Sequence, residues 1–209
     1  MKNYKEQNLV KLSSTTPGNK SHFLKKYRGY TLFEVLIALS IAGILGLQVA
    51  PSMHDLTARE RRVSSINRML SIIRYTRAQA LTKQKVITLC PTSDEHFCLG
   101  DWNQPLMIFI DLNKDRKRQQ NEPVLKKLPA IAKQDSLKWK AFRYSNVLQF
   151  LPSGITNHQN GTFLYCPDKT RSDLSRGIIM TKMGRTRLSA DRNHDGFQEG
   201  AGGRALSCV

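Results

Sequence analysis

The most distinctive pattern in the chain is a long apolar run near its N-terminus. Residues 30–50 contain one side chain that is normally charged, Glu34. A run of this length can cross a lipid bilayer as an α-helix. A carboxylate inside such a segment is costly in hydrocarbon and usually marks a functional group. The pattern therefore predicts a transmembrane helix over about 30–50 with a functional glutamate near its start.

The helical pattern continues beyond this run. After Pro51, apolar residues recur at the spacing of one helix face, and arginines occupy the opposite face. The apolar positions are Val63, Ile66, Leu70, Ile73, Ala80 and Leu81. We therefore expect one helix over about 30–84, apolar on all sides in its first half and amphipathic in its second. We expect the arginine face to be solvated, with contacts to membrane or DNA as the alternative.

From residue 86 onward the pattern changes to short strand-like runs that alternate with turn residues. The expected strands are 86–90, 106–111, 124–128, 137–144, 147–151, 162–166, 177–183 and 185–189. One long helix combined with antiparallel strands defines an α+β fold. In this fold the helix packs against an antiparallel β-sheet that forms the globular domain.

The residues at the start of the apolar run form an ordered motif. A basic stretch and Gly29 precede the sequence Tyr-Thr-Leu-Phe-Glu, which begins at Tyr30. An ordinary secretory signal has a shorter apolar core and a small-residue cleavage site, and Pro51 disfavours such a site at the end of this run. A plain signal anchor explains the length and the basic flank, but it does not explain the motif as a unit.

This motif closely resembles the signal of type IV pilins and type II secretion pseudopilins. The resemblance implies that a prepilin peptidase cleaves the chain after Gly29 and that the new N-terminus at Tyr30 is methylated. The usual residue after the cleavage site is Phe, so Tyr30 is a mild departure. In such proteins the glutamate, here Glu34, pairs with the N-terminal amine of a neighbouring subunit, which makes a buried charge tolerable in the filament.

The resemblance also implies an organisation for the whole chain. It divides the chain into a leader over 1–29, a long helix over 30–84 and a β-rich globular domain over 85–209. The leader is long for this class, whereas residues 24–29 alone would make a typical short leader. We therefore hypothesise that translation starts at codon 24.

Charge adds an expectation about partners. The chain has a formal net charge of +17, and the leader holds seven Lys and Arg and one Glu, so +11 remains after cleavage. An excess of this sign favours anionic partners such as nucleic acid, lipid head groups or cell-wall polymers. The alternative is a basic surface that only keeps the protein soluble.

The four cysteines are Cys90, Cys98, Cys166 and Cys208, and all follow the helix. An even number outside the cytoplasm indicates two disulfides, for which three connectivities exist. We favour Cys90–Cys98, a short local loop, together with Cys166–Cys208, which would tie the C-terminal tail to a strand. Zinc is the alternative, but no pair has Cys-x-x-Cys spacing and no histidine is well placed.

Further motifs extend the resemblance to a particular branch of the pilin-like proteins. The globular part is similar to that of the GspH/FimT family in its cysteines, in Trp102, in the run 109–115, in the run 164–166 and in the run 184–187. The similarity covers most of 28–209. It implies a GspH/FimT-like globular domain and a minor pilin or pseudopilin.

The run 184–187 reads Gly-Arg-Thr-Arg. In FimT-type minor pilins a Gly-Arg-x-Arg motif is associated with DNA binding during natural transformation. On a strand, Arg185 and Arg187 share a face, and guanidinium groups bind phosphate oxygens in a bidentate way. Lys182, Arg192 and Arg204 lie nearby in the sequence and would extend the patch. Such contacts are independent of sequence and sensitive to salt. The alternative is two surface arginines on a hairpin.

Two aspartate-rich segments imitate calcium loops. One runs from Asp191 and has Gly202 in place of the glutamate at its twelfth position. The other runs from Asp111 to Glu122, but Arg116 replaces the turn glycine. We expect an Asx-rich turn at each place and no metal site. The chain shows no catalytic motif and no cofactor motif, so we expect a protein that is not an enzyme.

The sequence therefore predicts a minor type IV pilin that binds double-stranded DNA and supports DNA uptake. Its other partners would be further pilins or pseudopilins and the prepilin peptidase. It would sit in the bacterial inner membrane with one span and a periplasmic globular domain, and later in a pilus or pseudopilus. One alternative is a GspH minor pseudopilin of the type II secretion system. A second is a purely structural minor pilin that primes pilus assembly.

Overall fold

A computed structural model describes residues 29–94 and 96–208, with the side chains of 47–52 excepted. Nearly all of the expected leader, 1–28, and the hypothesised start at codon 24 lie outside the described residues. The chain forms two compact units, which divide between Gly46 and Leu47. Helix α1 (Leu32–Lys83) contributes its first part to one unit and its second part to the other.

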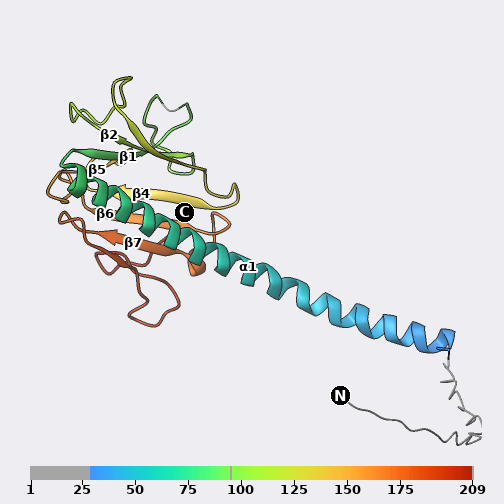
Figure 1. The fold of residues 1–209 in the computed structure, drawn as a ribbon. Helices are drawn as coiled ribbons and strands as arrows, with labels where there is room; N and C mark the ends of the chain where they lie inside the picture. The colour runs from blue at the N-terminus through green and yellow to red at the C-terminus, as the bar shows by residue number, and fades with distance from the viewer. Residues whose placement is uncertain (1–28, 95, 209) are drawn as a thin grey trace, which may run out of the picture. The chain divides into compact units, whose positions relative to one another are not determined.

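The first part of α1 begins at a capped turn. The Thr31 hydroxyl accepts a hydrogen bond from the backbone N–H of Glu34 at 3.3 Å, as an N-cap side chain does. Leu32, Phe33 and the apolar residues that follow are exposed in this unit (drawn in blue in Figure 1). An exposed apolar surface of this kind indicates a lipid or protein partner.

The membrane span expected over about 30–50 is not shown by the structure. No helical stretch within its described residues is long and apolar enough to cross a membrane. The expected span includes residues 47–50, whose side chains lie outside the described part of the chain.

The second unit contains two antiparallel four-stranded sheets, with strand orders β3-β2-β1-β5 and β4-β6-β7-β8. The strands are β1 (Ile87–Pro91), β2 (Leu106–Ile110), β3 (Val124–Leu128), β4 (Ser136–Ala141), β5 (Leu148–Phe150), β6 (Gly161–Cys166), β7 (Arg176–Met180) and β8 (Thr186–Leu188). A strand forms at each expected place, but the strands divide into two sheets, where the sequence predicted one. The strand expected over 137–144 ends at Ala141, and the strand expected over 177–183 ends at Met180.

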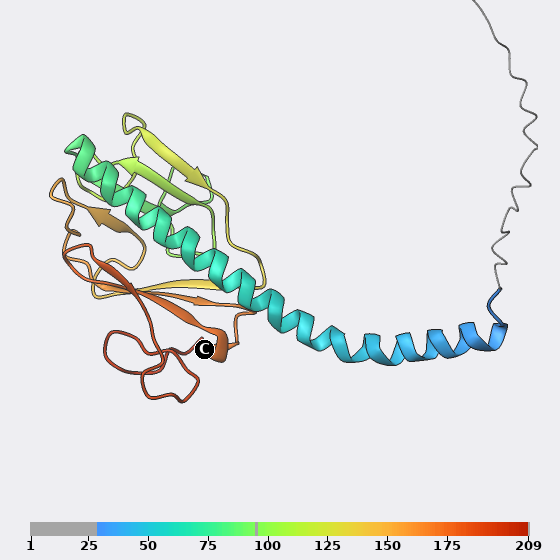
Figure 2. The same ribbon diagram turned by 60° about the horizontal axis from the view of Figure 1, so that its bottom comes forward.

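The main core lies between α1 and both sheets. Figures 1 and 2 show the second part of α1 lying along the sheets, where Ile66, Met69 and Ile73 are buried. Trp139 of β4 stacks on Phe163 of β6, with ring centroids 4.1 Å apart. Because both sheets turn one face toward this single helix, the apolar stripe of α1 is what joins them into one core.

The opposite faces of the sheets have smaller cores of their own, each closed by a disulfide. Cys90 joins Cys98, so the loop after β1 covers Met107 and Phe109. Cys166 joins Cys208, so the C-terminal tail covers the outer face of β6. This is the pairing that the sequence favoured. It also explains why β1 and β6 are almost uniformly apolar, since both of their faces are covered.

Several arginines of α1 fasten the helix to the globular domain and do not point to solvent, contrary to the expectation from the sequence. Arg61 forms an ion pair with Asp168, Nη2 to Oδ1 at 2.7 Å, and lies 3.5 Å from Asp135. Arg68 donates a hydrogen bond to the carbonyl of Pro129. These side chains have partners because the loops between strands fold back over the polar side of the helix.

A further ion-pair cluster ties the loop after β6 to α1. The Arg171 guanidinium donates to Asp55 of the helix at 2.9 Å and to Asp173 at 2.7 Å. The hydrogen bonds from Arg171 lower the pKa of both carboxyl groups. Both carboxylates therefore favour the folded state above their normal pKa, and this contribution is lost as the pH falls through the lowered values.

Candidate nucleic-acid interface

The turn between β7 and β8 carries the Gly-Arg-x-Arg motif. The backbone N–H of Thr181 donates to the carbonyl of Arg185 at 3.0 Å, and the N–H of Gly184 donates to the carbonyl of Thr181 at 2.9 Å. Gly184 has a φ of +72°, and a Cβ at this position would lie 2.6 Å from the carbonyl oxygen of Gly154. Only glycine fits both the left-handed backbone and this close approach. The glycine of the motif therefore shapes the turn.

Helix α1 holds this turn in place. Arg77 donates from Nε to the carbonyl of Gly154 at 2.8 Å and from Nη2 to the carbonyl of Met183 at 3.3 Å. One guanidinium thus bridges two loops that come from different sheets. The position of the motif relative to the helix follows from this bridge.

Arg185 lies in a groove between α1 and the turn. The groove has a volume of about 270 Å³ and is lined by Ile73, Arg74, Arg77, Arg185 and neighbouring residues of the turn. Three guanidinium groups therefore border one depression. We call it the helix groove.

Arg187 lies on the other face of its sheet. It pairs with Ile179 across β7 and β8, whereas Thr186 pairs with Met180, which belongs to the core under α1. Successive residues of a strand point to opposite faces, so Arg187 points away from α1. Together with Lys182 and Phe142 it lines a second groove of about 570 Å³, which we call the outer groove.

The sequence predicted one shared face for the two arginines of the motif, and in the structure they line two different grooves. Arg185 borders the helix groove and Arg187 borders the outer groove. Strand β8 begins at Thr186, and the backbone bond between Thr181 and Arg185 continues its pairing with β7 by one residue. Arg185 lies at the end of the turn, directly before β8, and is exposed.

The remaining expected contact residues lie in different places. Lys182 borders the outer groove with Arg187. Arg192 and Arg204 are exposed in the C-terminal tail and line neither groove. Ala201 of the same tail does border the outer groove. Sequence reasoning missed Arg74 and Arg77 because they lie more than 100 residues before the motif and the fold alone brings them together.

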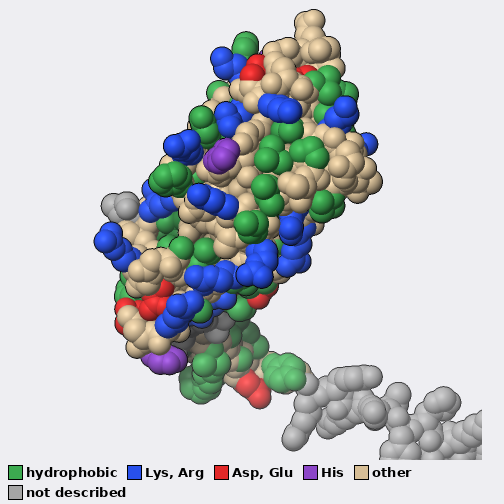
Figure 3. Space-filling model, turned by 90° about the vertical axis from the view of Figure 1, so that its left-hand side faces the viewer, with side chains coloured by type: hydrophobic (Ala, Val, Ile, Leu, Met, Phe, Trp, Pro, Cys, Tyr) green, Lys and Arg blue, Asp and Glu red, His purple; other side chains and the backbone are tan. Residues whose placement is uncertain are grey.

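The charge around the motif is not neutralised. Among the residues that the structure describes, no ion pair involves Arg74, Lys182, Arg185 or Arg187. In Figure 1 both α1 and β7 run toward the left-hand end of the globular domain. Figure 3 shows that end, where Lys and Arg side chains are widespread and Asp and Glu side chains are few. Unpaired cations near each other create a positive potential that attracts polyanions.

The two segments that imitate calcium loops form hydrogen-bonded turns. Asp111 accepts hydrogen bonds from Thr88 at 2.9 Å and from the N–H of Arg116 at 3.0 Å. Glu122 accepts from the N–H groups of Leu112 and Gln119. Within residues 29–94 and 96–208, no group of three or more His, Cys, Asp or Glu side chains could hold a metal ion.

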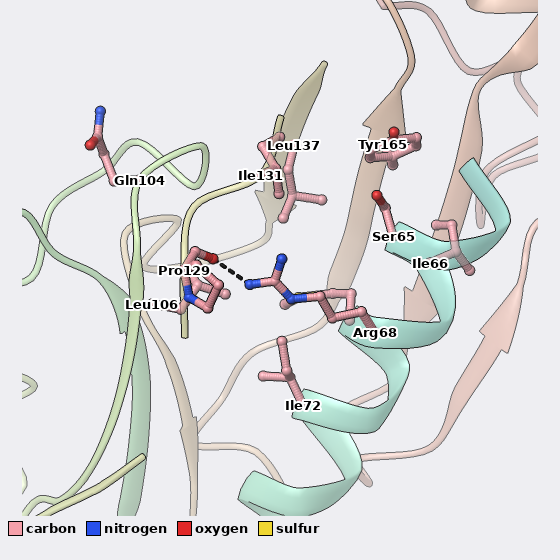
Figure 4. Close-up of a pocket in the computed structure, with 11 residues that line it drawn as sticks. Ser65, Ile66, Arg68, Ile72, Gln104, Leu106, Pro129, Ile131, Leu137 and Tyr165 are labelled. Carbon is pink, nitrogen blue, oxygen red and sulfur yellow. Dashed lines mark hydrogen bonds between the residues drawn. The ribbon is translucent and has the colours of Figure 1, made fainter. Parts of the chain in front are cut away.

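A separate apolar pocket opens between the two sheets beside α1 (Figure 4). Ile66 and Ile72 of the helix face Leu106, Ile131 and neighbouring side chains across it. Arg68 reaches over the pocket to the carbonyl of Pro129. The pocket is thus lined by apolar side chains of the core, with Arg68 at its border.

The processing and assembly residues expected from the sequence lie at the other end of the chain. Gly29 and Tyr30 precede α1 and are exposed, and Glu34 is exposed in its first turn. The bond to Thr31 comes from the backbone N–H of Glu34 and does not involve the carboxylate. A carboxylate in the first turn also interacts favourably with the helix dipole.

A long N-terminal helix joined to an antiparallel β-domain, with a methylation motif at its start, defines a protein of the type IV pilin-like class. The prokaryotic N-terminal methylation motif matches residues 24–47. The family described as Type II transport protein GspH matches residues 65–184, more than half of the chain. The chain belongs to this GspH family, and its role is that of a minor pilin or pseudopilin.

The solved structures of one minor pilin, FimU, show the same fold. Two crystal forms of the type IV minor pilin FimU from Pseudomonas aeruginosa are 20% identical to the chain. The first covers 74% of this chain and 99% of its own, with a TM-score of 0.54. The minor pseudopilin EpsH of the type 2 secretion system of Vibrio cholerae is 12% identical, covers 62% of this chain and 97% of its own, and has a TM-score of 0.46. No curated protein matches the chain.

Proposed function

We propose that the chain is a minor type IV pilin whose globular domain binds double-stranded DNA without sequence preference and supports DNA uptake. The observation that carries this proposal is the pair of basic grooves on either side of the β7–β8 turn. Their cations have no acidic partners among the described residues. Lys and Arg bind phosphates by charge and displace condensed counterions, so they grip any duplex.

The proposal includes the route by which the subunit reaches the filament. A prepilin peptidase cleaves after Gly29 and the amine of Tyr30 is methylated. The first part of α1 anchors the subunit in the inner membrane, with the globular domain in the periplasm, until it enters the pilus. The exposed apolar side chains that follow Tyr30 support this route, since they require a lipid or protein environment.

We predict that the double variant Arg185→Gln/Arg187→Gln binds duplex DNA about tenfold more weakly at low salt. If each arginine contacts one phosphate, the slope of log affinity against log salt becomes shallower by about 2. Fluorescence anisotropy with a labelled duplex at several salt concentrations measures both quantities, using the mature chain in a non-ionic detergent.

The variant Arg192→Gln/Arg204→Gln is the matched control, because it loses the same charge from residues that line neither groove. We expect it to weaken binding by less than about twofold. Equal losses in both variants would mean that net charge, and not the grooves, attracts DNA. If the wild-type protein does not bind duplex DNA at low salt, the DNA-binding proposal is refuted. A purely structural minor pilin would then be the better description.

We predict that Gly29→Trp blocks processing. The peptidase must accept the residue before the cleaved bond, and a bulky side chain replaces a glycine that has none. Mass spectrometry of the membrane fraction should show mature chains beginning at methylated Tyr30 in the wild type and only precursor in the variant. Thr31→Ala serves as the control, since it changes a neighbouring residue after the cleaved bond. Normal processing of the Gly29 variant would refute the cleavage site.

A second candidate is a minor pseudopilin of the type II secretion system. The match to the family described as Type II transport protein GspH favours it. Neighbouring genes separate the two candidates, since pilin and competence genes support the first and secretion genes support the second. Loss of transformation in a deletion strain, with normal protein secretion, is the result expected for the DNA-uptake role.

A further inference from the structure

The outer groove contains a feature that phosphate binding does not require. Phe142, which directly follows β4, lines this groove and is 69% exposed. Its backbone is fixed, because its N–H donates to the carbonyl of Asn160 at 2.9 Å. A large aromatic side chain is thus exposed to water at a fixed backbone position beside a basic groove. Such exposure of an aromatic ring indicates a partner with an apolar, flat surface.

One cation lies beside this ring, and two more line the same groove. The guanidinium of Arg143 lies 5.7 Å from the ring centroid of Phe142. Lys182 and Arg187 line the same groove, and the residues that form it include no Asp or Glu. An exposed aromatic platform flanked by Lys and Arg is the arrangement with which proteins hold single-stranded nucleic acid.

The neighbouring aromatic residue shows why Phe142 in particular is available. Tyr144 is also exposed, but the guanidinium of Arg116 lies only 3.8 Å above its ring centroid. One face of Tyr144 is therefore covered by an internal cation. The cation beside Phe142 lies almost 2 Å further away, which leaves the ring of Phe142 as the open stacking surface of this loop.

We propose that the outer groove binds unpaired nucleobases of single-stranded nucleic acid, with Phe142 as the stacking platform and Lys182 and Arg187 as phosphate contacts. Every base has a π-face, so such stacking tolerates any sequence. A duplex hides its base faces in the stack and offers only its backbone to the same groove. The inference rests on the proposed DNA-binding function and adds that the outer groove prefers single strands or frayed ends.

The test compares a labelled single strand of about 20 nucleotides with a blunt duplex of the same sequence, using the mature chain in detergent. Phe142→Ala should weaken single-strand binding about tenfold, the middle of the range for loss of one base stack. Duplex binding should change by less than about twofold. The salt slope for the single strand should stay unchanged, because the substitution removes no charge, whereas Lys182→Gln should make it shallower by about 0.7.

Two controls separate stacking from other causes. Phe97→Ala removes an equally exposed phenylalanine, 67% exposed, from the disulfide loop of the other sheet and should leave both affinities unchanged. Phe142→Leu keeps an apolar side chain without a π-face and should lose single-strand binding nearly as much as Phe142→Ala. Full binding by Phe142→Leu would point to a simple apolar contact, such as a neighbouring pilin, and would overturn the proposal.

The two proposals fail in different ways. If Phe142→Ala weakens single-strand and duplex binding equally, or weakens neither, the stacking platform is refuted while duplex binding through the arginines stands. If the wild type binds the single strand in a Phe142-dependent way but does not bind the duplex, the proposed duplex-binding function is refuted and the stacking site stands.

Discussion

Replacing Arg61 with Leu is expected to lower the free energy of unfolding by about 3–5 kcal/mol, the usual cost of leaving a buried charge without its partner. The side chain of Asp135 is 1% exposed and lies 3.5 Å from the Arg61 guanidinium. Its other oxygen accepts a hydrogen bond from the hydroxyl of Tyr165 at 2.6 Å. Burial, followed by the hydrogen bond to Asp135, raises the pKa of Tyr165, so the phenol stays protonated and keeps donating.

Urea unfolding of the mature chain in detergent, followed by tryptophan fluorescence, measures this loss. Arg59→Leu is the matched control on the same helix, because Arg59 is exposed, and it should change stability by no more than about 0.5 kcal/mol. Adding Asp135→Asn to Arg61→Leu should recover part of the loss, since it removes the charge that was left unpaired. Equal stability of the Arg61 and Arg59 variants would show that the ion pair contributes nothing to the fold.

Replacing Glu34 with Gln is expected to reduce incorporation into filaments by about 100-fold or more. The carboxylate would pair with the N-terminal amine of a neighbouring subunit in an apolar filament core. An unpaired amine in such a place costs about 3–5 kcal/mol, which corresponds to this factor. Glutamine keeps the size of the side chain and leaves α1 intact, so the variant tests the charge alone.

Immunoblots of sheared filaments and of membranes measure the distribution of the subunit. The Glu34 variant should accumulate in the membrane with a processed N-terminus. Glu60→Gln, an exposed position further along the same helix, should distribute as the wild type does. If filaments contain the Glu34 variant at the normal level, Glu34 has no role in assembly.

Much of the local structure could be predicted from the sequence because it depends on neighbours in the chain. The apolar period predicted a helix over 30–84, and the structure has α1 at Leu32–Lys83. Each of the eight expected strands has a counterpart in the structure. The α+β fold and the GspH/FimT resemblance are confirmed by the structure and by the family match. Gly29, Tyr30 and Glu34 remain predictions, since their roles depend on a peptidase and on other subunits.

The division of the strands into two sheets could not be read from the sequence. The strands of both sheets have the same kind of apolar pattern, so the pattern does not show to which sheet a strand belongs. Pairing is decided by contacts between distant segments, such as β1 with β5 and β4 with β6. The helix arginines are a related case. Helical spacing predicted that Arg61 and Arg68 are solvated, but loops of the folded domain supply partners for both.

The sequence alone determined the N-terminal methylation motif, the helix, the places of the strands and the presence of a Gly-Arg-x-Arg turn, because these follow from spacing along the chain. Only the tertiary structure decided which side chains lie around that turn. It brought Arg74 and Arg77 to the same groove as Arg185, and Phe142 to the same groove as Arg187. The physical reason is that a binding surface is made of side chains from different elements, and their proximity depends on which strands pair and where the pairing ends.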